Sequence, residues 1–177
     1  MRRTSFMEVV AFVMLLIIAG AAQAQDGQAI TRLRGFEEVP SLSTPGGGRF
    51  SAEIVGNEIH WELSYFHLRG AVTQAHIHFA QRGVNGGIMV FLCSNLGNGP
   101  AGTQVCPPSG SQSAPTTISG IIGPDDIIGP AAQGIGPSEY AEVLRAIRAG
   151  NAYANVHSDI FPGGEIRGQL LFFPEGD

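Results

Sequence analysis

The sequence has few charged residues, only two cysteines and no lysine. Charged residues make up 14% of the 177 residues, and the formal net charge is −5 at pH 7. An acidic balance disfavours nucleic acid as a partner, because a phosphate backbone requires a basic surface. All ten basic residues are arginine, a bias for which the sequence alone offers no explanation.

A hydrophobic run of membrane-spanning length is also missing. The apolar stretch from Val9 to Ala22 falls short of the ~20 residues that a helix needs to cross a bilayer. Arg2 and Arg3 precede this stretch, and Ala22-Gln23-Ala24 provides a small-x-small cleavage site. We therefore predict a secretory signal over residues 1–24, rather than an uncleaved anchor, and one mature domain over residues 25–177. The expected setting is extracytoplasmic, periplasmic or secreted, with no stable membrane span after cleavage.

Motifs for catalysis and for phosphate binding are lacking. No Gly-x-Ser-x-Gly motif occurs, which disfavours a serine hydrolase. The glycine-rich segment at residues 83–87 lies between two expected strands, so no helix N-terminus follows it to bind phosphate. Asp125-Asp126 has too few acidic neighbours for a calcium site and is interpreted as a turn. These shortages favour a non-catalytic protein over an enzyme.

The two cysteines, Cys93 and Cys106, both fall in the predicted exported part. An oxidising compartment favours one disulfide between them. A thiolate pair on a metal or two free thiols are the alternatives, although the twelve intervening residues match no zinc-ribbon spacing. The disulfide would anchor a surface loop over residues 94–115, which is rich in glycine, proline, serine and asparagine.

Hydrophobic alternation dominates the rest of the chain. Apolar residues alternate over residues 50–54 and 59–65 on either side of Gly56-Asn57, which predicts a β-hairpin. Further strands are expected over residues 72–79, 88–93, 116–122, 151–157 and 165–173. One helix is expected near residues 137–149, with acidic residues early, arginines late and Gly150 behind it. About seven or eight antiparallel strands with one helix predict an all-β fold, either a β-sandwich or a flattened Greek-key barrel.

Four segments together resemble one known family. They are Gly35-Phe36-Glu37-Glu38-Val39-Pro40, Ala75-His76-Ile77-His78 followed by Gly83 and Asn85-Gly86, the run from Ala149 to His157, and Gly164-Glu165-Ile166-Arg167-Gly168-Gln169. In this order and spacing they are similar to the CHRD family, named after chordin. The resemblance implies a β-sandwich-like fold and an extracytoplasmic setting, but no catalytic activity. Chordin binds growth factors largely through separate cysteine-rich modules that this chain does not contain, so growth-factor antagonism is not implied.

Polar residues recur on one face of three expected strands. Side chains alternate along a strand, so His76 and His78 share a face and lie ~7 Å apart along it. Tyr153, Asn155 and His157 share a face of the penultimate strand. Glu165, Arg167 and Gln169 do the same in the last strand. If these strands are neighbours, one sheet face concentrates His, Asn, Glu, Arg and Gln.

One hypothesis for this face is a metal site. His76, His78 and His157 would supply three imidazoles, with Glu165 or, as a weaker candidate, His67 as the fourth ligand. Three neutral imidazoles suit copper or zinc, and a His-x-His pair with a distant His is similar to the copper site of copper-zinc superoxide dismutases. The sequence has no bridging histidine and no second, zinc-type cluster, so dismutase activity is not expected.

The alternative is a structural polar network without a ligand. In it the histidines would bond to Asn155, Glu165 and backbone carbonyls, and Arg167 would pair with Glu165 while Gln169 extends the network. Such a network could specify strand register by itself. The sequence leaves two functional hypotheses open. One is an exported, non-catalytic module with an unidentified protein or cell-surface partner, and the other is a copper- or zinc-binding, possibly redox-active, extracytoplasmic protein.

Overall fold

The computed structural model describes residues 26–176, in which nine strands and one α-helix are found. The predicted signal, residues 1–24, lies outside this described part. The strands are β1 (Gly27–Arg34), β2 (Gly47–Val55), β3 (Glu58–Phe66), β4 (Val72–Phe79), β5 (Gly87–Ser94), β6 (Thr116–Ile122), β7 (Ala152–Ser158), β8 (Ile166–Gln169) and β9 (Leu171–Pro174). The helix α1 spans Tyr140–Arg148, and three 3₁₀ turns are η1 (Gly35–Glu37), η2 (Pro124–Asp126) and η3 (Ala131–Gln133). Within the described residues, no helix has the length and apolar character needed to span a membrane.

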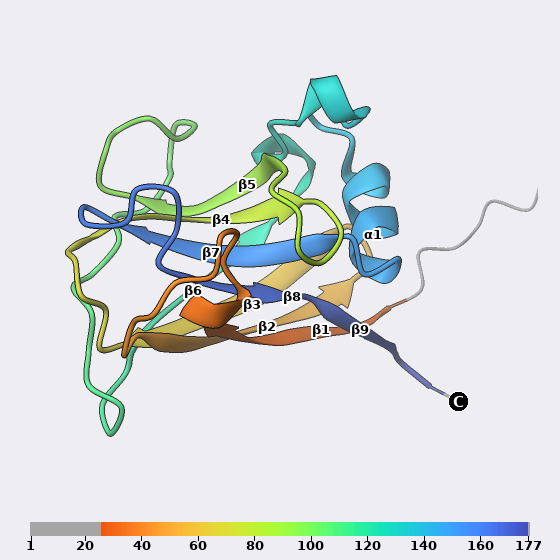
Figure 1. Cartoon of the computed structure of the whole chain (residues 1–177). Coiled ribbons are helices and arrows are strands. Elements are labelled where there is room, and N and C mark those ends of the chain that lie inside the picture. The colour runs from red at the N-terminus through yellow and green to blue at the C-terminus, as the bar shows by residue number, and fades with distance from the viewer. Residues whose placement is uncertain (1–25, 177) are drawn as a thin grey trace, which may run out of the picture.

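The strands form one antiparallel sheet that curls into a nearly closed barrel (Figure 1). The order is β5-β4-β7-β8-β1-β2-β3-β6, and β9 pairs with β1 next to β8. The loop behind β5 lies between the two edge strands, because the backbone N–H of Ser94 donates to the carbonyl of Gln104 and the Gln104 side chain donates to the carbonyl of Ser119 in β6. The all-β prediction is confirmed, with a single curled sheet in place of two separate ones.

The hairpin of β2 and β3 supplies much of the barrel core. Phe50 pairs with Leu63 and Ala52 with Trp61, so the alternating apolar side chains of both strands point to one face. Phe50 and Leu63 are fully buried, and Phe50 stacks on Trp61 with ring centroids 6.4 Å apart. Burying such a side chain stabilises the fold by roughly 1.5–3 kcal/mol, which fixes the register of the hairpin.

The helix packs across one end of the barrel (Figure 1). It begins at Tyr140 rather than near Pro137, because Ser138 has a left-handed backbone with φ +64° and Glu139 is the N-cap. Its inner face is buried through Tyr140, Val143, Leu144, Ala146 and Ile147. Glu142 lies in the first turn and two arginines in the last, the order that suits the helix dipole.

The strands differ from the sequence prediction in two ways. β1 has no counterpart in the predicted elements, and the single strand expected over residues 165–173 is divided into β8 and β9. The division falls at Leu170, which is fully buried and whose N–H donates to the carbonyl of Ala152. Beyond it β9 pairs with β1, where Leu171 lies opposite Ile30. The alternation of side chains continues across the division, so the sequence pattern alone did not show it.

Cys93 and Cys106 form a disulfide, with their Cα atoms 5.1 Å apart. Both cysteines are buried. Asn95 fastens the same loop, because its side-chain amide donates to the carbonyls of Val72 and Cys106 and accepts from the Cys106 N–H. The disulfide prediction is confirmed, and the loop is held to β4 and β5 at its base.

Candidate metal centre

Strands β4, β7 and β8 are neighbours and carry the polar face that the sequence indicates. His76 lies opposite Asn155, and His78 lies opposite Tyr153. Across the next pairing, Asn155 lies opposite Arg167, and Tyr153 opposite Gln169. The other face of β4 turns fully buried Ala75 and Ile77 into the barrel core. The polar face is therefore the outer side of the sheet.

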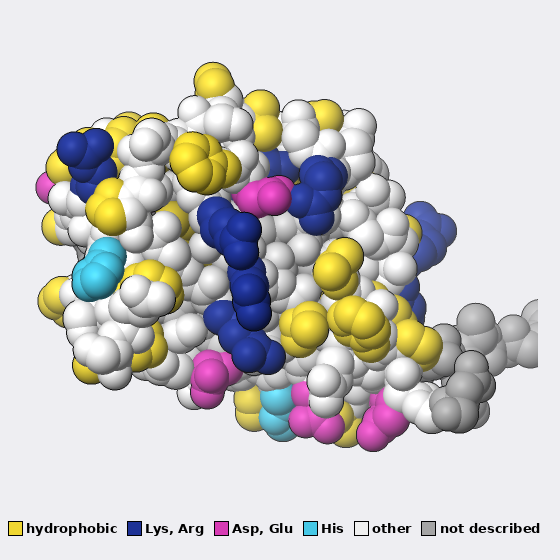
Figure 2. All heavy atoms as spheres, turned by 60° about the horizontal axis from the view of Figure 1, so that its bottom comes forward, with side chains coloured by type: hydrophobic (Ala, Val, Ile, Leu, Met, Phe, Trp, Pro, Cys, Tyr) yellow, Lys and Arg dark blue, Asp and Glu magenta, His cyan; other side chains and the backbone are white. Residues whose placement is uncertain are grey.

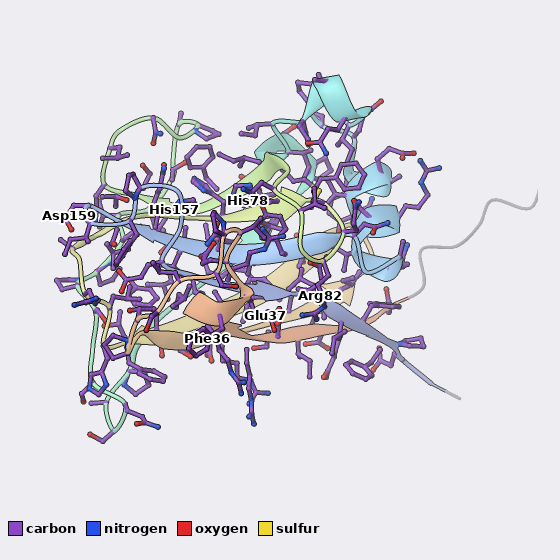
Figure 3. All side chains as sticks on the ribbon, viewed as in Figure 1. Phe36, Glu37, His78, Arg82, His157 and Asp159 are labelled. Carbon is purple, nitrogen blue, oxygen red and sulfur yellow. A yellow bond between two sulfur atoms is a disulfide. The ribbon has the colours of Figure 1, made fainter. Side chains whose placement is uncertain are left out.

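Three loops cover this outer face and bury its side chains. From the η1 segment, Glu38 accepts a hydrogen bond from Asn155. From the loop between β4 and β5, Asn85 accepts one from Arg167. From the loop between β7 and β8, the Pro162 carbonyl bonds to His157. Figure 3 shows His78 and His157 in the region where these loops pass over the sheet. The exposed fractions of His76 and Arg167 are 0% and 2%, so the polar layer is an interior.

The three histidines form one compact group. Nδ1 of His76 lies 3.2 Å from Nε2 of His157. The ring centroids are 5.3 Å apart for His76 and His78, and 5.9 Å apart for His78 and His157. One nitrogen from each ring lies within 4.8 Å of the others, a spacing compatible with a shared metal ion after small ring rotations.

Backbone carbonyls orient the rings. Nδ1 of His78 donates to the Gly86 carbonyl, and Nδ1 of His157 donates to the Pro162 carbonyl, both at 3.0 Å. Both rings therefore carry their proton on Nδ1 and present a lone pair on Nε2. His157 Nε2 then accepts from His76 Nδ1, which leaves a lone pair on His76 Nε2 as well. Among the described residues, Nε2 of His76 and Nε2 of His78 have no hydrogen-bond partner although both are buried.

Burial keeps the three imidazoles neutral. Desolvation, together with the neighbouring imidazoles, lowers the pKa of His76 to about 2. Desolvation likewise lowers the pKa of His78 to about 4, despite the hydrogen bond to the Gly86 carbonyl. The pKa of His157 is also lowered by burial. Metal ions bind the neutral form of histidine, so no proton has to be displaced at neutral pH.

Aromatic rings enclose the group on two sides. Tyr153 stacks on His78, with centroids 4.7 Å apart and planes 5° apart. Phe91 meets His76 edge to face at 4.4 Å. The Tyr153 hydroxyl accepts from the N–H of Gly86, the residue whose carbonyl holds His78. The rings exclude water, which strengthens polar interactions within the group.

Gly86 is required by its packing. A Cβ built on this residue would lie 1.8 Å from the carbonyl oxygen of Phe79, a distance that no side chain permits. The close approach places both the Gly86 N–H and its carbonyl over the polar face, where they hold Tyr153 and His78. The motif that sequence reasoning interpreted only as a loop thus orients a candidate ligand.

Arg167 does not pair with Glu165, contrary to the network that the sequence suggested. Its guanidinium donates to the Asn85 side chain at 2.9 Å and to the Val84 carbonyl at 2.5 Å. The Arg167 guanidinium carbon also lies 3.4 Å from the ring centroid of Tyr153. Glu165 precedes β8 and its carboxylate lies under a different loop, so the two side chains have different partners.

Glu165 and His67, the two proposed fourth ligands, lie apart from the three histidines. The Glu165 carboxylate is fully buried and accepts four hydrogen bonds, which come from the Thr44 and Ser158 hydroxyls and the N–H groups of Arg69 and Gly70. That set satisfies its lone pairs and makes it a structural anchor for three loops. His67 is exposed and contacts Phe66 edge to face. Of the predicted ligands, the structure brings together only His76, His78 and His157.

The remaining polar residues hold the surrounding loops. Asn155 donates to the Glu38 carboxylate at 2.7 Å and to the Ile166 carbonyl at 2.9 Å. Gln169 donates to the carbonyls of Ala80 and Gly150 at 2.8 and 2.7 Å. These two side chains thus connect strands to covering segments. The hydrogen bonds of the histidines go to one another and to backbone carbonyls, and not to Asn155 as the structural hypothesis expected.

Sequence reasoning missed Glu38. Its side chain is 7% exposed, and burial raises its pKa to about 7 against the opposing effects of Asn155 and Arg167. The signal was present, because Glu38 belongs to the segment at residues 35–40 that carries part of the family resemblance. No periodicity links that segment to the histidines, however, so only the fold shows that it covers them.

The fold and the site define a class of protein, namely a one-domain β-barrel whose outer face buries a histidine cluster under loops. The comparisons place the chain more narrowly. The family model described as CHRD domain matches residues 30–170, and the chain belongs to the CHRD family. No curated protein and no solved structure gives a significant match.

Proposed function

We propose that this CHRD domain is a non-catalytic, extracytoplasmic binding module that holds a copper or zinc ion through His76, His78 and His157. Membership of the CHRD family supports a binding module. The disulfide between Cys93 and Cys106 suits an oxidising compartment, in agreement with the predicted signal at residues 1–24.

The observation that carries the proposal is the pair of buried, unpartnered nitrogens, Nε2 of His76 and Nε2 of His78. A buried polar atom without a partner costs about 1–3 kcal/mol. A purely structural network that leaves both atoms without a partner bears this cost twice, on adjacent rings. A metal ion compensates both at once, because each nitrogen donates its lone pair to it. A small ring rotation that breaks the hydrogen bond from His76 Nδ1 makes Nε2 of His157 the third ligand.

The donor set selects the kind of metal. Neutral imidazole nitrogens suit copper and zinc, whereas magnesium and calcium prefer oxygen ligands. Among the described residues, no carboxylate joins the three histidines in the group. The bonds from His78 and His157 to backbone carbonyls set the ring orientation and raise the basicity of the ligands, as second-layer partners do in metal sites.

Metal titration of the full chain tests the proposal. The chain is purified, stripped with a chelator, and titrated with copper and with zinc, with elemental analysis after removal of excess metal. We expect one equivalent of at least one of the two metals to be retained. The double variant His76→Ala/His78→Ala should lose this binding, and His60→Ala should keep it, because His60 is an exposed residue beside Glu58.

Near-UV circular dichroism establishes that each variant is folded before titration. If the double variant does not fold, His78→Asn replaces it, since the asparagine Nδ2 takes the place of the histidine Nδ1 and can still donate to the Gly86 carbonyl, but it is not an imidazole ligand. Binding that is undiminished in a folded variant would sink the proposal, and so would a stripped protein that takes up neither metal. In that case the histidines form a structural network.

A further inference from the structure

Three arginines lie together on the outer face of the barrel, away from the histidine cluster. Arg32 and Arg34 alternate along β1, so both point outward, and Arg49 lies on β2 directly opposite Arg32. All three are exposed. Figure 2 shows a continuous column of basic side chains across this face. The chain as a whole is acidic, so this concentration of positive charge is local.

The column is unfavourable for the folded chain by itself. Like charges directly opposite each other on neighbouring strands destabilise a sheet, and Arg32 and Arg49 are such a pair. Within residues 26–176, no hydrogen bond or ion pair from a described side chain reaches the guanidinium of Arg32, Arg34 or Arg49. A cluster that costs stability and has no partner in its own chain calls for a partner from outside.

A groove of about 400 Å³ runs along these arginines. One end includes Arg82 and Glu37, which form an ion pair with each other. The other end is apolar, because Ile30 and Leu171 line it and Phe173 lies beyond Leu171 on the same strand. Leu171 and Phe173 are 53% and 51% exposed. The groove therefore offers guanidinium groups at one end and exposed apolar side chains at the other.

We propose that this groove binds an extended acidic segment of a partner protein, with its carboxylates on Arg32, Arg34 and Arg49 and an apolar side chain at the Ile30–Leu171 end. Arginine favours such a ligand, because its planar fork binds a carboxylate through two parallel hydrogen bonds. Arg32 and Arg34 are spaced by ~7 Å along β1, and alternate side chains of an extended peptide have the same spacing.

The shape and charge of the site favour a peptide over other anions. The three arginines and Leu171 that line the groove are exposed, whereas small-molecule sites enclose most of their ligand. A nucleic acid would meet the net negative charge of the rest of the surface, so a long polyphosphate is disfavoured. A purely charged polymer would leave the apolar end of the groove without a contact. The proposal is independent of the metal centre, because the groove residues are not among the candidate ligands.

Fluorescence anisotropy with a labelled peptide of alternating glutamate and leucine tests the groove. We expect saturable binding by the full chain that weakens as salt is raised, since the carboxylate contacts are exposed. The variant Arg32→Gln/Arg49→Gln should raise Kd roughly tenfold or more, as expected for loss of charge-assisted bonds. The control Arg69→Gln/Arg145→Gln removes the same two charges elsewhere on the surface and should leave Kd within about twofold.

The groove variant should remain folded, because removing Arg32 and Arg49 relieves repulsion between neighbouring strands. Urea unfolding that shows it at least as stable as the parent makes a binding defect interpretable. Equal weakening in both double variants would overturn the proposal in favour of general charge attraction. Three other results would do the same: undiminished binding of a glutamine–leucine peptide, tighter binding of polyglucuronate or single-stranded DNA, or a parent dimer that the groove variant abolishes.

Discussion

The guanidinium carbon of Arg167 lies 3.4 Å from the ring centroid of Tyr153, inside the polar layer rather than at the surface. His78 stacks on the same ring from the β4 side, because β7 lies between β4 and β8. The positive charge is thus held by an aromatic face and by the Asn85 and Val84 oxygens. Arg167 of β8 therefore contacts both the loop between β4 and β5, which covers the histidines, and the Tyr153 ring that stacks on His78.

Arg167→Lys should lower the free energy of unfolding by about 2 kcal/mol, because lysine cannot reproduce both the stacking and the two-sided hydrogen bonds. The measurement is urea unfolding followed by tryptophan fluorescence. Arg145→Lys is the matched control, since Arg145 is exposed and pairs only with Glu142 at the helix surface. Its change should stay within about 0.5 kcal/mol. Equal stability of the two variants would show that the stacked guanidinium contributes little.

The strands and the histidine face could be predicted from local patterns. Alternation fixed the faces of His76 and His78, and the turn at Gly56-Asn57 set the hairpin register. These features depend on residues close together in the chain. The neighbouring positions of β4, β7 and β8 came only from chemical analogy and family resemblance, because long-range pairing leaves no periodic signal in one sequence.

The covering loops could not be predicted. Glu38 reaches Asn155 across 117 positions of the chain, and Arg167 reaches Asn85 across 82. The Glu165 carboxylate was assigned to the histidines because strand alternation places it near Arg167. In the structure two other loops and the last residue of β7 satisfy it with four donors. The paths of the loops determine which donors each buried carboxylate binds. The periodic pattern of a sequence does not specify those paths.

Gly164→Ala should destabilise the protein by about 1–3 kcal/mol, because the residue has an unfavourable backbone and no room for a side chain. Its φ is +128°, and a Cβ would lie 2.7 Å from both the Asn155 Nδ2 and the Glu38 Oε1. Gly163→Ala is the control, since a Cβ there meets nothing within 4 Å. Thermal unfolding of both variants decides the matter, and a Gly164→Ala protein as stable as Gly163→Ala would contradict the close packing of the loop.

Replacing the disulfide by Cys93→Ser/Cys106→Ser should cost about 2–3 kcal/mol, the entropy regained by a loop of this length in the unfolded chain. The sequence separation of the two cysteines is 13. Reductant should destabilise the parent by a similar amount and leave the double serine variant unchanged. Both cysteines are buried, so reductant can be slow to reach them in the folded parent. The parent is therefore unfolded and brought to equilibrium in reductant before its free energy of unfolding is compared with that of the oxidised protein. Equal stability of oxidised and reduced protein would contradict the prediction.

The metal-free protein should lose stability as the pH falls from about 6.5 to about 4. The pKa of His78 is about 4 in the folded chain, and that of His76 about 2, against an ordinary value of 6.5. Between these values the unfolded chain binds protons that the native chain excludes. The stabilising contribution of the neutral histidines is therefore complete above pH 6.5 and is lost below it. Urea unfolding across this range, in the presence of a chelator, measures the slope.

Glu38 acts in the opposite direction and supplies the control. Its pKa is raised from 4.5 to about 7, so the native chain holds a proton that the unfolded chain has released between these values. Its contribution is present below about pH 4.5 and is lost as the pH rises through 7. Glu38→Gln removes this opposing effect, and the glutamine oxygen can still accept from Asn155. We expect the variant to lose stability more steeply than the parent as the pH falls, and to gain on the parent between about pH 5 and about pH 8. A parent curve that is flat from about pH 7 to about pH 4, with the same shape in the variant, would show that neither the histidines nor Glu38 titrate as their burial requires.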